Sequence, residues 1–297
     1  MKVAIDDLSA RRLTVAIDGG EVALLRFGRA GATPFLFAHA NGFCASAYRR
    51  MFEAMGEAFD IFAADLRGHG RTRLPTNLEN HRSMAIFGDD LRRTKAALAT
   101  LSAARPWVLA GHSLGGVAAL HAAAGDPAVA AVRLIEPVAM PRLWNALAGS
   151  ALWPLIAPSV PLVRSASRRR DRWPERTAAL QSYARKPFFA GWATGVLEDY
   201  LEDGLTPDDQ GVRLACAPAW EAATFAAQAN DLWGALSRIS APVGVLAADH
   251  PSSTLRGGAA ARFRRFGASV ERLGGVTHLI PFEAPERAAA FLADGSR

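Results

Sequence analysis

The chain has 297 residues, half of them hydrophobic, and a formal net charge of +6. This length and composition allow one large core, built as a single domain or as a domain with an inserted lobe. Almost all of the cations are arginine, and positive charge by itself does not indicate nucleic-acid binding, so we expect no nucleic-acid partner.

The N-terminal part of the chain is charged, at Lys2, Asp6 and Asp7 among others. No apolar run follows these charges, so we expect no signal peptide. Residues 12–17 and 21–27 then alternate apolar and polar side chains around an Asp-Gly-Gly sequence. This pattern predicts a β-hairpin.

Strands and helices alternate after the hairpin. We predict strands over residues 34–38, 61–64, 106–110, 129–135, 242–247 and 268–273, and helices over residues 46–58, 83–101, 117–124 and 285–292. Alternating units of this length are typical of a mostly parallel sheet with helices on both faces. The predicted fold class is therefore α/β.

The alternation stops between residue 140 and about residue 240. This interval contains no convincing strand for a parallel sheet, and it holds six of the seven tryptophans. We interpret residues 140–240 as a helical cap inserted into a core made of residues 1–139 and 241–297. The tryptophans of the cap either build its own small core or line an apolar pocket.

One stretch of the predicted cap, residues 143–163, has no charged side chain. Three prolines in its second half argue against a continuous membrane-spanning helix and favour a broken apolar helix that covers a pocket. An arginine-rich stretch follows, from Arg164 to Arg176. We expect it to be a solvated surface of the lobe, and binding to an acidic partner or an anionic membrane surface is the alternative.

Residues 111–116 read Gly-His-Ser-Leu-Gly-Gly, between an apolar run and an alanine-rich run. A strand that turns sharply into a helix here leaves Ser113 in a strained backbone conformation with its hydroxyl exposed, as a nucleophile requires. Gly111 and Gly115 are expected because a Cβ would clash in so tight a turn. Leu114 opens the helix, so its unpaired N–H can face a developing oxyanion.

A serine hydroxyl needs a base within hydrogen-bond reach, and the base needs an acid that holds its tautomer. His278 lies in a glycine-containing loop after the last predicted strand and fits a nucleophile–acid–base order along the chain. His112 belongs to the turn at the serine and is expected to point away from the hydroxyl. The other histidines lie in turns, a helix and a polar linker.

Two glycine-containing turns precede the serine. Residues 39–43, His-Ala-Asn-Gly-Phe, follow a predicted strand, and a turn there can bring the N–H of Asn41 beside that of Leu114. The alternative is a turn without a catalytic part. Residues 65–70, Asp-Leu-Arg-Gly-His-Gly, contain reactive residue types, but we expect a turn held by side-chain hydrogen bonds.

Four segments, residues 39–43, 65–70, 111–116 and 275–281, together resemble the α/β-hydrolase fold family in order and spacing, over essentially the whole chain. The resemblance implies a Ser–acid–His triad, an oxyanion hole of two amides and an acyl-enzyme mechanism. The serine nucleophile also separates the chain from the aspartate-nucleophile branches of the family.

Two acidic residues can complete the triad. In most members of the family the acid follows the strand after the cap in a Gly-x-x-Asp turn, but here the glycine is missing and Asp249 falls one residue early. Some branches use the end of the strand before the cap, where this chain has Glu136. An acid at that strand end, before a proline, is also an ordinary structural feature of the family. We prefer Glu136, and Asp249 is the alternative.

The predicted function is a serine hydrolase that cleaves a carboxylic ester, lactone or thioester of a small to medium apolar substrate. The same site supports acyl transfer or carbon–carbon bond hydrolysis, and a ligand-binding protein without turnover is the alternative from another class. Cys44 and Cys216 lack metal-binding spacing and fit a reducing compartment, so we expect a cytoplasmic protein. We expect no metal or organic cofactor, and a monomer or homodimer.

Overall fold

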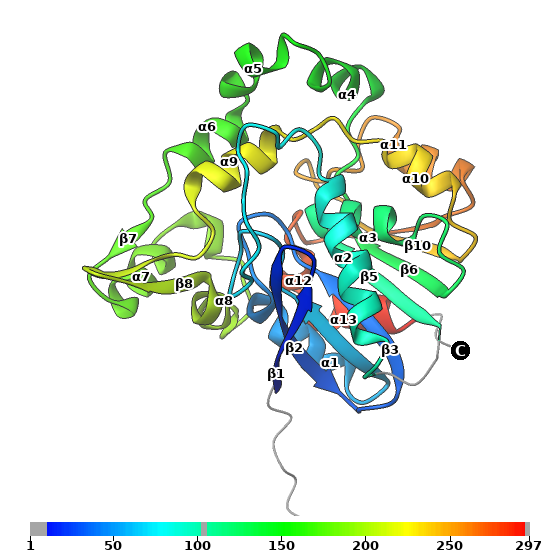
Figure 1. Cartoon of the computed structure of the whole chain (residues 1–297), viewed down its shortest axis with the longest axis horizontal. Helices are drawn as coiled ribbons and strands as arrows, with labels where there is room; N and C mark the ends of the chain where they lie inside the picture. The colour runs from blue at the N-terminus through cyan, green and yellow to red at the C-terminus, as the bar shows by residue number, and fades with distance from the viewer. Residues whose placement is uncertain (1–10, 102–105, 295–297) are drawn as a thin grey trace, which may run out of the picture.

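The structure is a computed structural model that describes residues 11–101 and 106–294 (Figure 1). The charged N-terminal residues that bear on a signal peptide lie outside the described residues. Eight strands form a central sheet in the order β1-β2-β4-β3-β5-β6-β10-β11. Their bounds are β1 Arg11–Ile17, β2 Gly20–Gly28, β3 Thr33–Ala38, β4 Phe59–Ala64, β5 Trp107–His112, β6 Val129–Ile135, β10 Val243–Ala248 and β11 Ser269–Leu273.

The pairing of these strands places several of their carboxyl ends together. β1 and β2 form the predicted hairpin, and β2 also pairs antiparallel with β4. The remaining pairs, β4–β3, β3–β5, β5–β6, β6–β10 and β10–β11, are parallel. The turns that follow β3, β5, β6 and β10 therefore meet at one edge of the sheet, where open α/β sheets bind ligands.

Helices cover both faces of the sheet. Their bounds are η1 Ala45–Tyr48 (a 3₁₀ helix), α1 Arg49–Met55, α2 Ala85–Leu98, α3 Leu114–Ala123, α11 Ala259–Arg265, α12 Ile280–Glu283 and α13 Pro285–Ala293. Side chains alternate along each strand, so Leu36 packs in the core with α2 and α3, whereas Phe35 and Phe37 pack in the core with α1 and α13. The predicted α/β fold class is confirmed. The short helices α11 and α12 were not predicted because they show no clear helical period.

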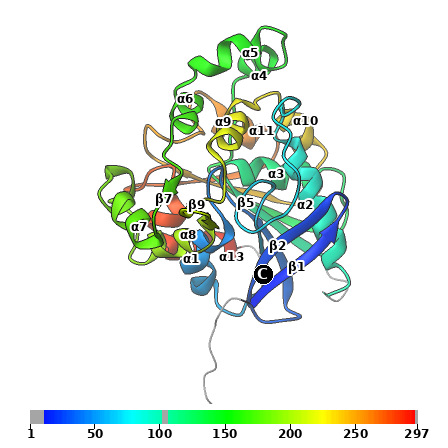
Figure 2. The same ribbon diagram turned by 60° about the vertical axis from the view of Figure 1, so that its left-hand side comes forward.

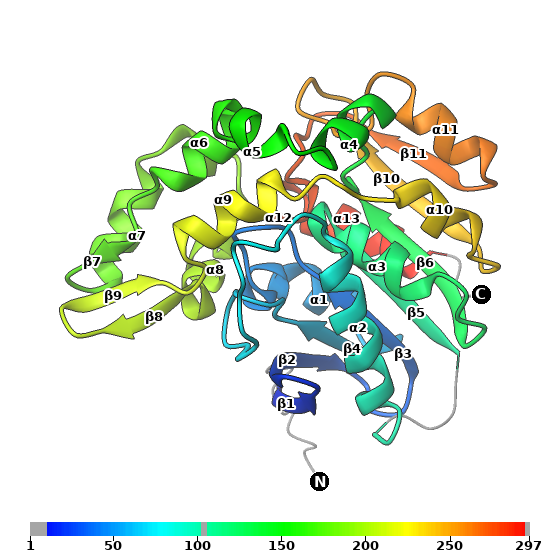
Figure 3. The same cartoon turned by 45° about the horizontal axis from the view of Figure 1, so that its top comes forward.

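Between β6 and β10, no element of the described chain joins the central sheet. The bounds there are α4 Arg142–Ala148, α5 Trp153–Ile156, η2 Ala157–Ser159, α6 Pro161–Ser167, β7 Arg172–Trp173, α7 Arg176–Ala184, η3 Pro187–Phe189, α8 Val196–Gly204, β8 Leu205–Asp208, β9 Gly211–Leu214, α9 Pro218–Ala226 and α10 Leu232–Ser237. The strands form a separate antiparallel sheet in the order β7-β9-β8 (Figure 3). Strands of two to four residues are too short to show an alternating pattern, so this sheet was not predicted.

Two helices of this interval bury side chains in the core rather than in a separate lobe. Tyr200 and Leu201 of α8 lie in the core cluster of α1 and η1. Leu232 and Leu236 of α10 lie in the core cluster of α2 and α3. The interval is therefore tied to both faces of the sheet, and the domain boundaries at residues 140 and 240 remain a prediction.

The uncharged stretch 143–163 is broken into short helices, as its prolines predict. Pro154, Pro158 and Pro161 each lie in the first turn of a separate helix, α5, η2 and α6. Leu143 and Leu155 are 81% and 80% exposed, and Figure 2 shows α4 and α5 at the top of the molecule. No helix in the described residues is long and apolar enough to cross a membrane.

Candidate active site

The turn between β5 and α3 centres on Ser113, whose φ of 55° and ψ of −113° are unfavourable for a residue with a side chain. A Cβ on Gly115 would lie 1.9 Å from the carbonyl oxygen of Ala38, and a Cβ on Gly111 would lie 2.1 Å from that of Gly115. Both positions therefore require glycine. The close approach of Gly115 to Ala38 also brings the start of α3 against the end of β3.

Two backbone amides near this turn are free. In the described part of the chain, the N–H groups of Asn41 and Leu114 donate no hydrogen bond. The neighbouring amides of Ala40 and Gly42 are used, because they donate to the Tyr48 hydroxyl and to Nε2 of His69. Asn41 and Leu114 follow the ends of the paired strands β3 and β5, the arrangement that the sequence predicts for two oxyanion donors.

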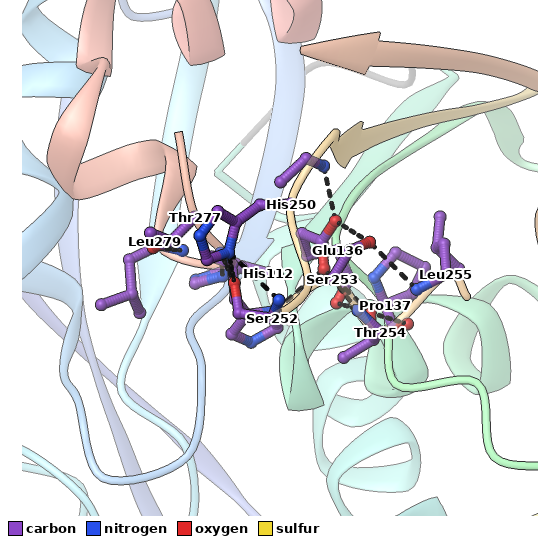
Figure 4. Close-up of polar contacts among 12 residues, drawn as sticks. His112, Glu136, Pro137, His250, Ser252, Ser253, Thr254, Leu255, Thr277 and Leu279 are labelled. Carbon is purple, nitrogen blue, oxygen red and sulfur yellow. Dashed lines mark hydrogen bonds and ion pairs between the residues drawn. The ribbon is translucent and has the colours of Figure 1, made fainter. Parts of the chain in front are cut away.

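The residue after β6 is Glu136, which is fully buried and has a φ of 49°. Its Oε1 accepts hydrogen bonds from the Ala248 N–H at 2.6 Å and from the Ser253 hydroxyl at 2.7 Å. Its Oε2 accepts from the N–H of Thr254 at 2.8 Å and from the Thr254 hydroxyl at 3.1 Å (Figure 4). A buried carboxylate with this many donors is satisfied in its charged form.

The structure brings His278 against this carboxylate. Its Nδ1 lies 3.0 Å from Oε2 of Glu136. Burial raises the pKa of Glu136, but the hydrogen bonds from His278, Ser253 and Thr254 outweigh it, so that this pKa lies below its usual range. The backbone N–H of His278 also donates to the Ser252 hydroxyl at 2.9 Å. With Nδ1 directed at Glu136, the ring's other nitrogen, Nε2, is left for a second partner.

The alternative acid lies elsewhere. The side chain of Asp249 is 73% exposed, and its nearest cation is Arg272, 3.9 Å away. Its backbone N–H pairs with Leu273, so Asp249 continues the alignment of β10 with β11 instead of turning toward His278. In the described residues no hydrogen bond joins the Ser113 hydroxyl to His278. Such bonds are often long before substrate binds.

His112 is a residue of the candidate site to which the sequence analysis gave no role beyond its place in the turn. Its ring is fully buried, and its Nε2 lies 3.0 Å from the carbonyl oxygen of His278, so Nε2 donates. Its Nδ1 then accepts from the Tyr48 hydroxyl at 2.7 Å. Because that hydroxyl accepts from Ala40, a buried chain of hydrogen bonds joins the Asn41 turn to the His278 loop. The only sign of this contact in the sequence was the position of His112 next to Ser113, at the end of the buried strand β5.

Two more histidines connect the turns 39–43 and 65–70 through hydrogen bonds. Nε2 of His39 accepts from the Leu66 N–H, and Nε2 of His69 accepts from the Gly42 N–H. Burial lowers the pKa of His69 to about 4, so the ring is neutral and able to accept at neutral pH. Asp65 accepts from the amides of Ala45 and Arg71 and closes the second turn. These contacts agree with the structural role that we expected for residues 65–70.

The six tryptophans of the interval 140–240 differ in their surroundings. Trp144 is 41% exposed, and four others are buried: Trp153, Trp173, Trp220 and Trp233. Trp220 and Trp233 belong to the core cluster that contains Leu114. Trp192 differs, because its ring packs against Phe43, next to the Asn41 turn, and against Phe282. Phe282 in turn packs against His112. Trp192 therefore brings the interval to an aromatic cluster beside the predicted site.

The arginine-rich stretch is not uniformly a solvated surface, which corrects that expectation. Most of its arginines are exposed, but Arg169 is largely buried and forms an ion pair with Glu221 at 2.9 Å. It also donates to the hydroxyls of Tyr183 and Tyr200. Because Glu221 lies 52 positions from Arg169 along the chain, no local pattern in the sequence predicts this ion pair. Within the part of the chain that is described, no group of three or more His, Cys, Asp or Glu side chains could hold a metal ion.

Comparisons with known proteins agree with this architecture. A sequence model described as "Alpha/beta hydrolase family" matches residues 35–291, and no curated protein matches the chain. The structure of E-2-(acetamidomethylene)succinate hydrolase is similar with a TM-score of 0.75 and 21% identity, covering 95% of this chain and 97% of that one.

Two further solved structures are similar over nearly their whole length. The thioesterase domain from the curacin biosynthetic pathway has a TM-score of 0.72 at 18% identity, with 96% and 99% of the two chains covered. A putative aryl esterase from Burkholderia cenocepacia has a TM-score of 0.63 at 20% identity, with 96% and 97% covered. At this level of identity the likeness shows the fold alone.

Proposed function

Because the chain belongs to the alpha/beta hydrolase family, we propose that it is a serine hydrolase that cleaves a carboxylic ester, lactone or thioester through an acyl-enzyme. The observation that carries this proposal is the 3.0 Å contact between Nδ1 of His278 and the buried carboxylate of Glu136, beside a strained serine turn. Ser113 is the nucleophile, His278 the base and Glu136 the acid that orients the base.

The reaction begins when the Ser113 hydroxyl attacks the carbonyl carbon of the substrate. Nε2 of His278 accepts the hydroxyl proton, because Nδ1–H is held by Glu136, and the carbonyl electron pair moves onto oxygen. The N–H groups of Leu114 and Asn41 bind this oxyanion, and one such donor stabilises the transition state by about 3 kcal/mol. His278 then gives its proton to the leaving group.

Water completes the cycle. It attacks the acyl carbon while His278 accepts one of its protons, and the proton returns to Ser113 as the acid product leaves. Throughout, the buried Glu136 carboxylate stabilises the imidazolium that forms at each proton transfer. Its five donors hold it in the charged state that this task requires.

The aromatic cluster of Phe43, Trp192 and Phe282 supports an apolar acyl or leaving group. Phe43 directly follows the Asn41–Gly42 pair, and neither it nor Trp192 is fully buried. Partly exposed aromatic faces bind apolar groups favourably. We therefore propose small to medium apolar esters, lactones or thioesters as the substrate class.

The test is hydrolysis of aryl esters of increasing acyl chain length by the wild-type protein and by Ser113→Ala. We expect Ser113→Ala to lose at least 10³-fold in kcat and to resist labelling by a fluorophosphonate. Ser165→Ala, which removes an exposed hydroxyl on α6, is the matched control and keeps both properties. Full activity of Ser113→Ala would rule out the mechanism, and a preference for added alcohols over water would indicate acyl transfer.

A further inference from the structure

A buried polar cluster from the interval between β6 and β10 lies directly on the Asn41 turn. Arg169 is its centre: Nη1 pairs with the carboxylate of Glu221, and Nη2 donates to the hydroxyls of Tyr183 and Tyr200, each at 2.9 Å. Nε also donates to Tyr183 at 3.3 Å. All three nitrogens of the Arg169 guanidinium therefore donate hydrogen bonds, and these bonds fix the positions of Glu221, Tyr183 and Tyr200.

Two members of this cluster contact the turn. The Tyr200 hydroxyl donates to the carbonyl oxygen of Gly42 at 3.1 Å, and the backbone carbonyl of Glu221 accepts from Nδ2 of Asn41 at 3.0 Å. Contact is close enough that a Cβ on Gly42 would lie 2.5 Å from Oε1 of Glu221. Gly42 has a φ of 78°, so glycine is required there on both grounds.

The other side of the turn is held by the core. The carbonyl oxygen of Ala40 accepts from Nδ1 of His39 at 2.8 Å and from the N–H of Phe43 at 3.2 Å. These two bonds hold the Ala40–Asn41 peptide group, which is planar and trans, from the side of Ala40, and the groups that follow it in the turn also bear on the direction of the Asn41 N–H. After that peptide group, the Gly42 N–H donates to Nε2 of His69, and the cluster holds the Asn41 side chain and the Gly42 carbonyl.

We propose that Tyr200 and Glu221, ordered by Arg169, are positioning residues that hold the Asn41 N–H in the direction of the oxyanion. The inference rests on the proposed function and deepens it, because it makes oxyanion binding depend on residues of the interval between β6 and β10. An oxyanion donor contributes only when it is directed at the transition-state oxygen before the reaction begins. Misplacement by about 1 Å can cost up to about 10²-fold in rate.

The experiment compares Tyr200→Phe with Tyr183→Phe. Both variants remove one buried hydroxyl that accepts from Arg169, but only Tyr200 also donates to Gly42. We expect Tyr200→Phe to lower kcat about tenfold with KM changed by less than about twofold. Tyr183→Phe should stay within about twofold in both constants. Glu221→Gln, which weakens the pairing with Arg169, should also lower kcat, and it serves as the second variant if Tyr200→Phe does not fold.

A trifluoromethyl ketone gives the readout that loss of stability alone would not change. The Ser113 oxygen adds to its carbonyl carbon, His278 takes the hydroxyl proton, and the carbonyl oxygen becomes the bound oxyanion. Its Ki should rise about tenfold in Tyr200→Phe and stay unchanged in Tyr183→Phe. Equal effects of the two variants on kcat and Ki, or an effect on melting temperature alone, would overturn this inference. A wild-type protein without Ser113-dependent turnover would instead overturn the proposed function.

Discussion

The ends of β6 and β10 lie side by side in the sheet, and each is followed by an acidic residue, yet the two acids lie in opposite surroundings. Glu136 after β6 is fully buried, takes a positive φ and accepts five hydrogen bonds. Asp249 after β10 is mostly exposed and lies 3.9 Å from Arg272. Neighbouring strand ends in one sheet therefore present very different carboxylates.

The difference shows what the loop after β10 contributes. Ser253 and Thr254 in this loop donate to Glu136 across 117 and 118 positions of the chain. The loop therefore supplies hydrogen-bond donors to the carboxylate that follows the neighbouring strand. A carboxylate that must stay charged while buried needs such donors, because an unpaired buried charge is expensive.

The largest expected effect comes from exchanging each acid for its amide. Glu136→Gln should lower kcat roughly 10³–10⁴-fold on an aryl ester, because the amide no longer holds His278 in the tautomer that leaves Nε2 free. Asp249→Asn is the matched control at the adjacent strand end, and its kcat should change by less than about twofold. Steady-state kinetics of both purified variants decide the point. The reverse ranking would make Asp249 the acid.

A second effect concerns the donors to Glu136. Ser253→Ala removes a 2.7 Å hydrogen bond to a buried carboxylate and should lower the free energy of unfolding by about 1.5–3 kcal/mol. The measurement is urea-induced unfolding at neutral pH. Ser252→Ala is the neighbouring control, because the Ser252 hydroxyl contacts the His278 backbone and not Glu136. Equal losses of stability in the two variants would show that the hydrogen bond to Glu136 contributes no more than the hydrogen bond to the His278 backbone.

The pH dependence of stability tests the lowered pKa of Glu136. The folded-state pKa of Glu136 is lowered, so its contribution to stability is complete above the unfolded value, about 4.3, and is lost as pH falls through the folded value. The stability advantage of the wild type over Glu136→Gln should therefore shrink as pH falls from neutral to values below about 4.3. Chemical unfolding of both proteins across this range tests it, and a constant difference would contradict the lowered pKa.

The smallest expected effect is at the end of β10. Asp249→Asn should change the free energy of unfolding by less than about 0.5 kcal/mol, because an exposed ion pair at 3.9 Å is weak and screened by salt. Unfolding at low and at high salt should give nearly the same difference between this variant and the wild type. A loss above about 1.5 kcal/mol would show that Asp249 makes a contact that its exposed position does not suggest.

Much of the architecture was predictable from local pattern. The hairpin, the strands of the central sheet and the turn at Ser113 follow from alternation of apolar residues and from glycines that a tight turn requires. The small sheet β7-β9-β8 and the helices α11 and α12 were not predictable, since segments of two to seven residues carry too little periodicity.

The sequence by itself determined the fold class and the positions of Ser113, Asn41 and His278 along the chain, because strand, turn and helix signals are local. Tertiary structure alone decided which carboxylate meets His278, that Arg169 is largely buried in an ion pair with Glu221, and that His112 links two loops of the candidate site. The physical reason is that burial and hydrogen-bond partners decide the role of a polar side chain. Here the partners come from segments 52 to 166 positions away along the chain.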